Sequence, residues 1–427
     1  MSNDNRFEEA SSTNPQFTHP SVVRSDERFE LRIDGLPRGI PVIISASMDD
    51  DKGNTWQTSA RYRTNDGSLE LDRTPPIDGP FESADTMSLI QAMEPVDEVD
   101  IPYQIPEEAT LEVRVSADGT ILGTSSLTRT IADPGVKSLP TPDHLVGELY
   151  VPAGDEPAPG VLLLHGGDGR PLDEQARLLA SHGFAALALK YFNFIGQWDN
   201  PSLPTGLVEI PVEYADEAVE WLLDHDRVQG SSVGLYGFSK GSELGLQVAS
   251  HNSNIGAVVS LNGSALTWQG IVEGGDNPGP TWTHDGEPVP YIEWADDIDW
   301  ELEEPIEFRQ KYTASYEAAS VKEIEAATTP VERIEGPVVF ITGGDDQMWN
   351  TGRFNQHAID RLEAYDRPYE HLYFEEAGHT ILPPYRPVAN REVGYWLFGG
   401  SPEAYASADE PYWQRTIETL STIDTEQ

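Results

Sequence analysis

The sequence predicts an all-β sandwich followed by an α/β domain, whose mostly parallel sheet carries helices on both faces. Three observations support this prediction. The chain has 427 residues, more than one core usually serves, so two domains are expected. Short runs of alternating polar and apolar residues fill its first third, which is typical of antiparallel strands. Continuous apolar runs then alternate with amphipathic segments, which is typical of a buried parallel sheet and its helices.

The first domain is predicted over residues 21–135, after a polar segment, 1–20, that we expect to be disordered. An immunoglobulin-like sandwich of two antiparallel sheets suits the spacing of its short runs. The strands are expected within FELRIDGLP, IPVIISASMDD, WQTSARYRTNDG, ATLEVRVSADG and ILGTSSLTRTI. Asp66-Gly67 and Asp118-Gly119 suit the tight turns that join such strands.

The second domain is predicted over residues 140–425, because the proline-rich run 133–143 breaks both periodicities. The apolar runs that indicate its strands are 161–166, 185–192, 232–238, 256–263, 337–344 and 370–376. Thr267–Pro305 interrupts the alternation with tryptophan, glycine, proline and acidic residues. We expect that stretch to pass over the end of the sheet that carries the active site.

The composition excludes some kinds of binding site and disfavours some kinds of partner. The 73 acidic residues outnumber the 27 Lys and Arg residues, for a net charge of −46, and they are spread along the chain. Such a surface suits high salt, where repulsion is screened, and disfavours nucleic-acid binding. There are no cysteines, so disulfides and thiolate zinc sites are excluded. Neither a signal peptide nor an apolar run of about 20 residues occurs, so we expect a soluble, cytoplasmic protein. No loop has the spacing of metal ligands, so we expect no metal, and we expect no cofactor.

The candidate nucleophile is Ser239, at the centre of Gly237-Phe238-Ser239-Lys240-Gly241. The pentapeptide matches G-x-S-x-G, the sharp turn between a strand and a helix that exposes a serine hydroxyl. By itself the pentapeptide is weak evidence for a nucleophile, since an ordinary Gly/Ser turn would have the same sequence. Its position is more specific, because an apolar strand precedes it and a plausible helix follows.

A serine nucleophile needs a base and an orienting carboxylate, which in this fold follow it in chain order as acid and then histidine. His379 follows the strand EHLYFEE, and it is the candidate base. Asp345 and Asp346 follow the strand PVVFITG. The usual Gly-x-x-Asp spacing from Gly343 selects Asp346, and Asp345 is the runner-up.

The oxyanion of the tetrahedral intermediate needs backbone N–H donors. One is expected from Lys240, directly after the nucleophile, and the other from Gly167 in the turn after the strand VLLLHG. His165 is expected to pack beneath that loop. The Lys240 side chain is expected either at the surface or in an ion pair with Glu243. The substrate-binding residues stay unknown: the aromatic candidates (Tyr191, Phe192, Phe194 and Trp349) suit an acyl pocket but are more often plain core.

These motifs carry a resemblance to the acyl-CoA thioesterase and bile acid-CoA:amino acid N-acyltransferase family. The runs concerned are PGVLLLHGGDG, VGLYGFSKGSELGLQVAS, GGDDQMWN and YFEEAGHTILPPYRP, together with PVIISASMDDDKGNTWQTSARYRTNDGSLELDRTP in the first domain. The resemblance covers most of residues 30–420 and implies an α/β-hydrolase domain with a triad of Ser239, Asp346 and His379. The acidic composition and the length of Thr267–Pro305 depart from the family pattern.

We therefore expect an acyl-CoA thioester hydrolase that works through a serine acyl-enzyme, as a monomer or small homo-oligomer. One alternative is an acyltransferase that passes the acyl group to an amino acid. Another is a dienelactone-hydrolase-like carboxylesterase, which the N-terminal sandwich disfavours. A third alternative is a binding module that keeps the fold without catalysis. The presence of all three residues, Ser, Asp and His, disfavours it.

Overall fold

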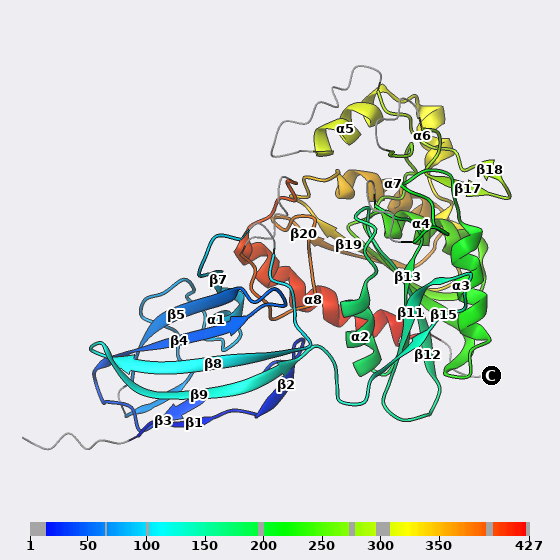
Figure 1. Cartoon of the computed structure of the whole chain (residues 1–427). Helices are drawn as coiled ribbons and strands as arrows, with labels where there is room; N and C mark the ends of the chain where they lie inside the picture. The colour runs from blue at the N-terminus through cyan, green and yellow to red at the C-terminus, as the bar shows by residue number, and fades with distance from the viewer. Residues whose placement is uncertain are drawn as a thin grey trace, which may run out of the picture. The chain divides into compact units, whose positions relative to one another are not determined.

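A computed structural model describes residues 14–64, 66–99, 102–194, 200–272, 278–295, 308–389 and 396–423. They form two compact units. The first takes in the described residues up to Val99, together with Tyr103–Thr130 and Tyr385–Ala389. The second contains Ile131–Pro384 and the described residues that follow Asn390. Figure 1 draws the first unit in blue and cyan and most of the second in green to red.

The first unit is a sandwich of two sheets, as the alternating pattern predicts. One has the order β2-β9-β8-β4-β5-β7 and the other the order β1-β3-β6. Strand β5 alternates exposed and buried residues over its whole length, so its polar side chains face solvent and Trp56, Thr58, Ala60 and Tyr62 face the core. The strands are β1 Gln16–Thr18, β2 Val22–Arg24, β3 Arg32–Asp34, β4 Pro41–Asp49, β5 Thr55–Arg63, β6 Ser68–Glu70, β7 Glu94–Pro95, β8 Glu108–Ala117 and β9 Thr120–Thr130.

Strand β1 lies inside the segment that we expected to be disordered. It pairs with β3, with Phe17 opposite Ile33, so the expectation is wrong for Gln16–Thr18. The run Gln16–Thr18 is too short for an alternating pattern to be recognised in the sequence. It becomes an ordered strand because it pairs with β3. Residues 1–13 lie outside the described residues. A short helix, α1 (Ser88–Gln91), buries Leu89 and Ile90 in the sandwich core.

The second unit is built on a sheet with the order β10-β11-β13-β12-β15-β16-β19-β20. From β13 to β20 neighbouring strands are parallel, whereas β10, β11 and β13 pair antiparallel. The predicted fold class, an α/β domain after a sandwich, is confirmed. The strands are β10 Lys137–Pro140, β11 Val146–Val151, β12 Ala158–Leu164, β13 Ala185–Lys190, β15 Val228–Phe238, β16 Ile255–Leu261, β19 Val338–Gly343 and β20 Tyr369–Phe374.

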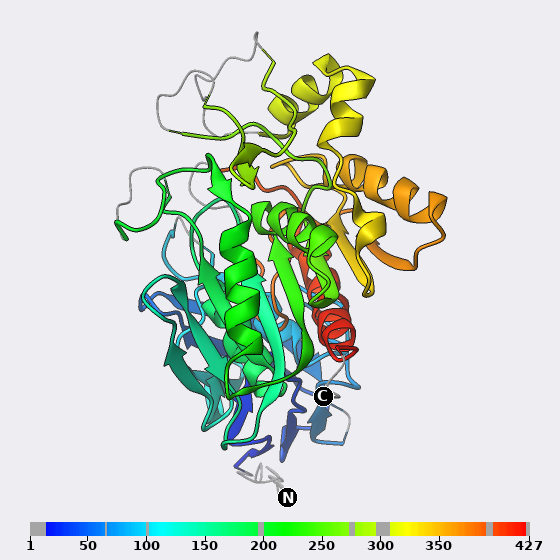
Figure 2. The same ribbon diagram turned by 90° about the vertical axis from the view of Figure 1, so that its right-hand side faces the viewer.

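Helices cover both faces of this sheet. Leu235 of β15 points to the helix that follows the nucleophile, where a side chain on Gly245 would clash with it. On the opposite face, Tyr236 shares a hydrogen bond with Tyr412 of the C-terminal helix (O···O 2.8 Å). Figure 2 shows α3 and α4 on the near face of the sheet. The helices are α2 Asp173–Ser181, α3 Glu213–Leu223, α4 Lys240–His251, α7 Thr351–Ala364 and α8 Pro402–Leu420.

The stretch Thr267–Pro305 leaves the sheet after β16. In its described parts, β17 (Trp282–His284) and β18 (Glu287–Pro288) join β14 (Ile210–Pro211) in a small separate sheet. Its aromatic residues pack with the chain that follows: Trp268 lies edge-on to Tyr312 of α5 (Phe308–Ala318), with ring centroids 4.8 Å apart. Helix α6 (Val321–Ala327) and the 3-10 helix η1 (Val331–Arg333) lead back to the sheet.

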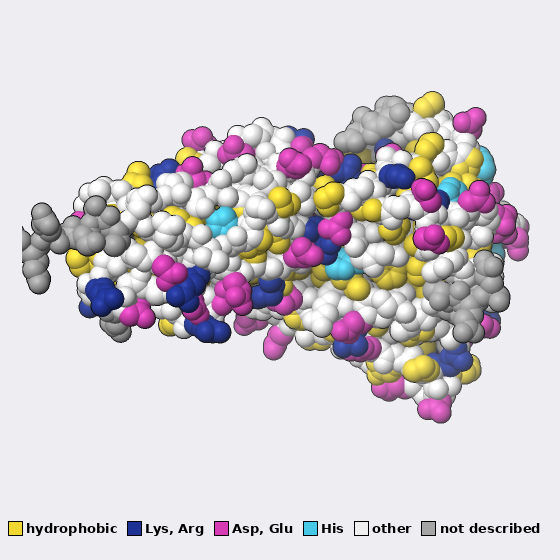
Figure 3. Space-filling view, turned by 90° about the horizontal axis from the view of Figure 1, so that it is seen from below, with side chains coloured by type: hydrophobic (Ala, Val, Ile, Leu, Met, Phe, Trp, Pro, Cys, Tyr) yellow, Lys and Arg dark blue, Asp and Glu magenta, His cyan; other side chains and the backbone are white. Residues whose placement is uncertain are grey.

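Acidic side chains lie scattered over the face drawn in Figure 3 and do not gather in one patch. This distribution agrees with the even spread of Asp and Glu along the sequence. None of the described helices is both long and apolar enough to cross a membrane.

Candidate active site

The nucleophile elbow joins β15 to α4. Ser239 has φ 54° and ψ −120°, a strained backbone conformation that lifts its hydroxyl away from both elements. The two glycines of the motif are required because neighbouring backbone atoms leave no room for a side chain at either position. A Cβ on Gly241 would lie 2.1 Å from the Leu164 carbonyl oxygen, and one on Gly237 would lie 2.5 Å from Ser242 Cα. The sequence can therefore turn sharply here only with glycine at both positions.

The three predicted triad residues come together at the carboxyl ends of their strands. His379 Nε2 lies 3.0 Å from Ser239 Oγ, and His379 Nδ1 lies 2.7 Å from Asp346 Oδ2. All three are buried, with exposed fractions of 8% for Ser239, 3% for His379 and 1% for Asp346. The arrangement supplies a base for the serine proton and a carboxylate that fixes the orientation of the imidazole.

The carboxylate of Asp346 is held from several sides. Its Oδ2 also accepts a hydrogen bond from Thr351 Oγ1 (2.6 Å), and its Oδ1 accepts from the backbone N–H of Met348 (2.8 Å) and of Trp349 (3.2 Å). These bonds leave the carboxylate of Asp346 little rotational freedom.

Asp345, the runner-up, points elsewhere. It is exposed and accepts hydrogen bonds from the backbone N–H of Gly400 (2.9 Å) and from Gln347 Nε2 (2.7 Å). The geometry brings Asp346 and not Asp345 to the histidine, because successive residues of the loop after β19 face opposite sides.

The loop expected to complete the oxyanion hole follows β12, which is the parallel neighbour of β15. A Cβ on Gly166 would lie 3.3 Å from Ser239 Cβ, and one on Gly167 would lie 3.6 Å from Lys240 Cγ. The loop thus lies directly against the nucleophile elbow. It also lies at the point where the strand order changes direction, between β13 on one side of β12 and β15 on the other.

His165 packs under this loop. It is fully buried, its Nδ1 lies 2.8 Å from the Gly166 carbonyl oxygen, and its ring stacks on Tyr191 with centroids 4.2 Å apart. Burial lowers the pKa of its imidazole to about 3, so the ring is neutral at physiological pH. His165 therefore supports the loop and does not exchange protons with the substrate.

Lys240 and Glu243 form a buried ion pair beneath the nucleophile. Lys240 Nζ lies 2.6 Å from Glu243 Oε2, and both side chains are almost inaccessible. Glu243 Oε1 accepts from Trp282 Nε1 (2.8 Å) and from the backbone N–H of Trp268 (3.2 Å). Of the two expectations for the Lys240 side chain, the ion pair is the one present. The pair also ties the Thr267–Pro305 stretch to the first turn of α4.

Asn262 is a site residue that the sequence analysis did not select. It is fully buried at the end of β16, with φ 42°. Its Nδ2 donates to the carbonyl oxygen of His379 (2.8 Å), its Oδ1 accepts from Gly343 N (2.7 Å), and its own carbonyl accepts from Trp349 Nε1 (2.9 Å). Asn262 thus links the loop of the acid to the loop of the base. The only sequence signal was an Asn-Gly pair after a strand.

The four aromatic candidates for an acyl pocket lie in three different environments. Tyr191 and Phe192 are fully buried and belong to the main core of the second unit. Trp349 is buried with its ring edge-on to His379, at 6.3 Å between centroids, while Phe238 and Phe398 also flank that imidazole. Phe194 is partly exposed. An apolar shell around the imidazole limits water near the reacting atoms.

One group of described side chains has the spacing of metal ligands. Glu213, His284 and Asp285 place one ligand atom each within 4.8 Å of the others. They are partly or fully exposed, and Glu213 already accepts a hydrogen bond from the backbone N–H of Asp285. The triad does not include them, and its chemistry calls for no metal.

A buried Ser-His-Asp chain at the carboxyl edge of a mostly parallel sheet defines a serine hydrolase of the α/β-hydrolase fold. Comparison with known proteins then places the chain in the acyl-CoA thioester hydrolase/BAAT family, to which it belongs. The family region described as "BAAT / Acyl-CoA thioester hydrolase C terminal" matches residues 210–422, and the "Acyl-CoA thioester hydrolase/BAAT N-terminal region" matches residues 26–142.

Two curated relatives match almost the whole chain. The peroxisomal succinyl-coenzyme A thioesterase of Mus musculus is 31% identical, with 92% of each chain covered. The acyl-coenzyme A thioesterase 1 of Homo sapiens is 32% identical, with 91% of this chain and 92% of the relative covered. Among solved structures, a dienelactone hydrolase-like promiscuous phosphotriesterase from metagenomic libraries has a TM-score of 0.42 and 17% identity, over 68% of this chain and 98% of that one.

Proposed function

We propose that this protein hydrolyses acyl-CoA thioesters through an acyl-enzyme on Ser239. The observation that carries the proposal is the hydrogen-bonded chain from Ser239 through His379 to Asp346, in a member of the acyl-CoA thioester hydrolase/BAAT family. The names of the two relatives, both thioesterases of coenzyme A derivatives, support the same substrate class.

In the first half-reaction, Ser239 Oγ attacks the thioester carbonyl carbon while its proton passes to His379 Nε2. The negative charge on the carbonyl oxygen is stabilised by the backbone N–H groups proposed for this role, those of Gly167 and Lys240. The intermediate collapses by breaking the C–S bond, and the imidazolium returns its proton to the departing sulfur of CoA. Asp346 stabilises the imidazolium throughout, without taking its proton.

In the second half-reaction, His379 takes a proton from water as the water oxygen attacks the acyl ester. A second tetrahedral intermediate forms, and the Ser239 oxygen departs with the proton held by His379. Free acid leaves and the resting enzyme is restored.

The transferase alternative differs only in the nucleophile of the second step. An oxygen ester on Ser239 resists attack by an amine more than a thioester on cysteine would. Water should therefore prevail unless a site holds the amine in position, where effective concentrations become very large. We expect free acid as the product even with tens of millimolar glycine or taurine present. We expect Ser239→Cys to shift the ratio toward the amide.

The test is a screen of acyl-CoA chain lengths by thiol release, with the products identified by mass spectrometry. Ser239→Ala should lose activity by several orders of magnitude while keeping its circular dichroism spectrum. Full activity in Ser239→Ala would overturn the mechanism. N-acyl amino acid as the main product would overturn hydrolysis in favour of transfer. Turnover of simple esters but not of thioesters would favour the carboxylesterase alternative.

We also infer a two-domain organisation in which residues 21–135 accompany a catalytic domain at 140–425, acting as a monomer or small homo-oligomer in the cytoplasm. The strongly acidic composition disfavours nucleic acid and anionic membranes as partners. Size-exclusion chromatography with light scattering tests the assembly state. Activity recovered with the membrane fraction of a cell extract would contradict the location.

A further inference from the structure

The sandwich buries an arginine that has no carboxylate partner among the described residues. Arg129 lies near the end of β9 and is 4% exposed. A guanidinium group has five N–H donors. Its Nη1 donates to the carbonyl oxygen of Tyr385 (2.6 Å) and its Nη2 to that of Ser25, whereas its Nε has no hydrogen-bond partner. Among the described residues, two neutral carbonyl groups are therefore its only hydrogen-bond acceptors.

One acidic side chain, Asp26, favours the charged form of Arg129, but it already has a cationic partner of its own. Asp26 is paired with Arg24, whose Nε lies 2.5 Å away, and both of those side chains are buried. Burial lowers the pKa of Arg129 to about 10, which still leaves the guanidinium protonated at neutral pH. A buried cation without a counter-charge is destabilising, because the charged group loses its hydration without gaining an opposite charge. The described part of the sandwich thus buries a cation whose two hydrogen-bond acceptors are both neutral.

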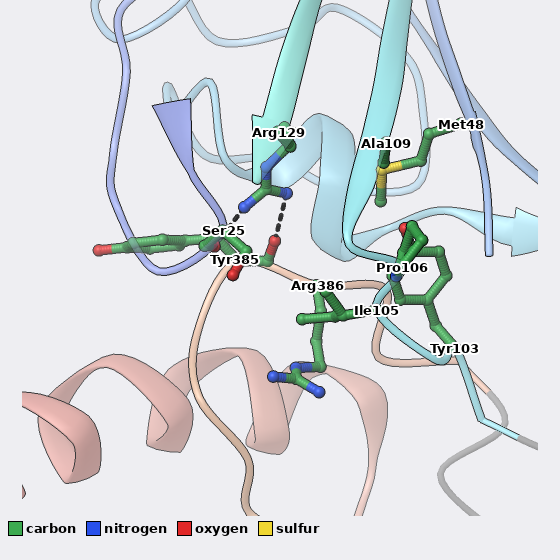
Figure 4. A pocket seen from close by; sticks show the side chains of 9 residues that line it. All are labelled: Ser25, Met48, Tyr103, Ile105, Pro106, Ala109, Arg129, Tyr385 and Arg386. Carbon is green, nitrogen blue, oxygen red and sulfur yellow. Dashed lines mark hydrogen bonds between the residues drawn. The ribbon is translucent and has the colours of Figure 1, made fainter. Parts of the chain in front are cut away.

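A small cavity adjoins this arginine. Ser25, Arg129, Tyr385 and Arg386 line part of its wall, and Met48 and Ala109 line another part. All the lining residues are labelled in Figure 4, where the two hydrogen bonds of Arg129 are dashed and the guanidinium of Arg386 points away from that of Arg129. None of the described residues that line the cavity carries a carboxylate. Its volume of about 10 Å³ suits a single water molecule or one small ion.

A second donor lacks a partner at the same place. Ser25 Oγ is buried, and like Arg129 Nε it has no hydrogen-bond partner in the part of the chain that the structure describes. Unsatisfied buried donors are rare in native proteins, because each one loses its hydrogen bonds to water without a replacement. Two unsatisfied donors, an unpaired guanidinium and the absence of any acid in the wall together have the chemistry of an anion site.

We propose that this cavity binds a small monovalent anion, chloride in a salt-rich medium. A halide accepts hydrogen bonds from N–H and O–H groups and cancels the charge of Arg129. A water molecule would satisfy the donors but would leave the charge unbalanced. Sulfate and phosphate are too large for a cavity of this volume. The bound anion would stabilise the sandwich together with Tyr385–Ala389, the segment of the late chain that belongs to the same unit.

The test is thermal unfolding at constant ionic strength, with chloride replaced stepwise by gluconate, which is too large for the cavity. A ligand that binds only the folded state raises the melting temperature with the logarithm of its concentration. Above the dissociation constant we expect a rise of about 5 °C for each tenfold increase in chloride. Equal melting temperatures in chloride and gluconate would overturn the proposal.

Three variants separate this site from a general salt effect. Arg129→Gln should lose the chloride-specific rise. Ser25→Ala keeps the guanidinium and both carbonyl bonds, so it should fold and should need several times more chloride for the same rise. Arg114→Gln is the matched control, because Arg114 lies exposed on neighbouring β8 and pairs with Glu112 at 2.7 Å. A chloride response in Ser25→Ala and Arg129→Gln equal to that of Arg114→Gln would contradict the site.

Crystals grown in sodium bromide give the direct measurement. Bromide replaces chloride and scatters anomalously, whereas water does not. We expect an anomalous peak in the cavity, within about 3.5 Å of the Arg129 guanidinium and of Ser25 Oγ. Density for water alone at that position would overturn the proposal.

Discussion

The Lys240–Glu243 pair offers the sharpest test of the physical reasoning about the active site. Glu243 is fully buried and Lys240 is 3% exposed. Burial raises the pKa of Glu243 and lowers that of Lys240, while the attraction between the two charges opposes both shifts. Replacing Glu243 with Gln keeps an oxygen acceptor for Trp268 and Trp282 but removes the negative charge. The ammonium group of Lys240 is then left buried and unpaired.

Breaking a buried ion pair from one side is destabilising by about 3–5 kcal/mol. We therefore expect Glu243→Gln to reduce the free energy of unfolding of the second unit by about that amount at pH 7. The double variant Lys240→Met with Glu243→Gln removes the stranded charge as well. It should be more stable than Glu243→Gln alone by about 3–5 kcal/mol, because a pair removed from both sides is close to neutral.

The pH dependence gives an independent check. In Glu243→Gln the buried Lys240 should have a folded-state pKa far below that of the unfolded chain, so the unfolded state binds more protons. The stability of this variant should therefore increase as pH rises from 7 to 9.5, and that of the double variant should not. This sign is opposite to that of a lysine that gains a carboxylate partner on folding.

The assay is urea unfolding at fixed molar salt, followed by tryptophan fluorescence, with thiol release measured on the same samples. Trp56 is the only one of the 10 tryptophans that precedes residue 131, so the fluorescence reports mainly on the second unit. A loss below about 1 kcal/mol in Glu243→Gln, or a double variant no more stable than the single one, would refute the reasoning.

Three further predictions concern the acid, the salt response and the buried imidazole. Asp346→Asn should reduce kcat about 10⁴-fold, and Asp345→Asn by less than about tenfold; the reverse order would show that the acid is misassigned. Melting temperature and activity should rise from low to molar salt, because screening weakens repulsion among the 73 acidic residues; a flat or falling curve would contradict adaptation to salt. His165 is neutral in the fold, so stability should fall as pH drops below about 6.5, since the unfolded chain takes up a proton that the fold excludes. His165→Phe should weaken that slope in acid unfolding, and an unchanged slope would contradict the assignment.

The sequence by itself determined the order of the two domains and the identity of three residues that the structure brings together. Apolar residues alternate with polar ones in the sandwich and form continuous runs in the parallel sheet. These two patterns were sufficient to predict the domains, because burial of a strand on one face or on both imposes them locally. Ser239, Asp346 and His379 could be selected because this fold places each of them directly after a strand, in a fixed order. Such signals are contained within a few neighbouring residues.

Only the tertiary structure decided which side chains meet across long stretches of chain. Asn262 joins the loops of Gly343 and His379, and Glu243 joins the elbow to Trp282, yet neither contact has a local pattern. The short strand β1 acquires its order from β3, and Arg129 meets Tyr385, 256 residues later. Hydrogen bonds between buried polar groups depend on packing that brings distant segments together, and no spacing in the sequence records it.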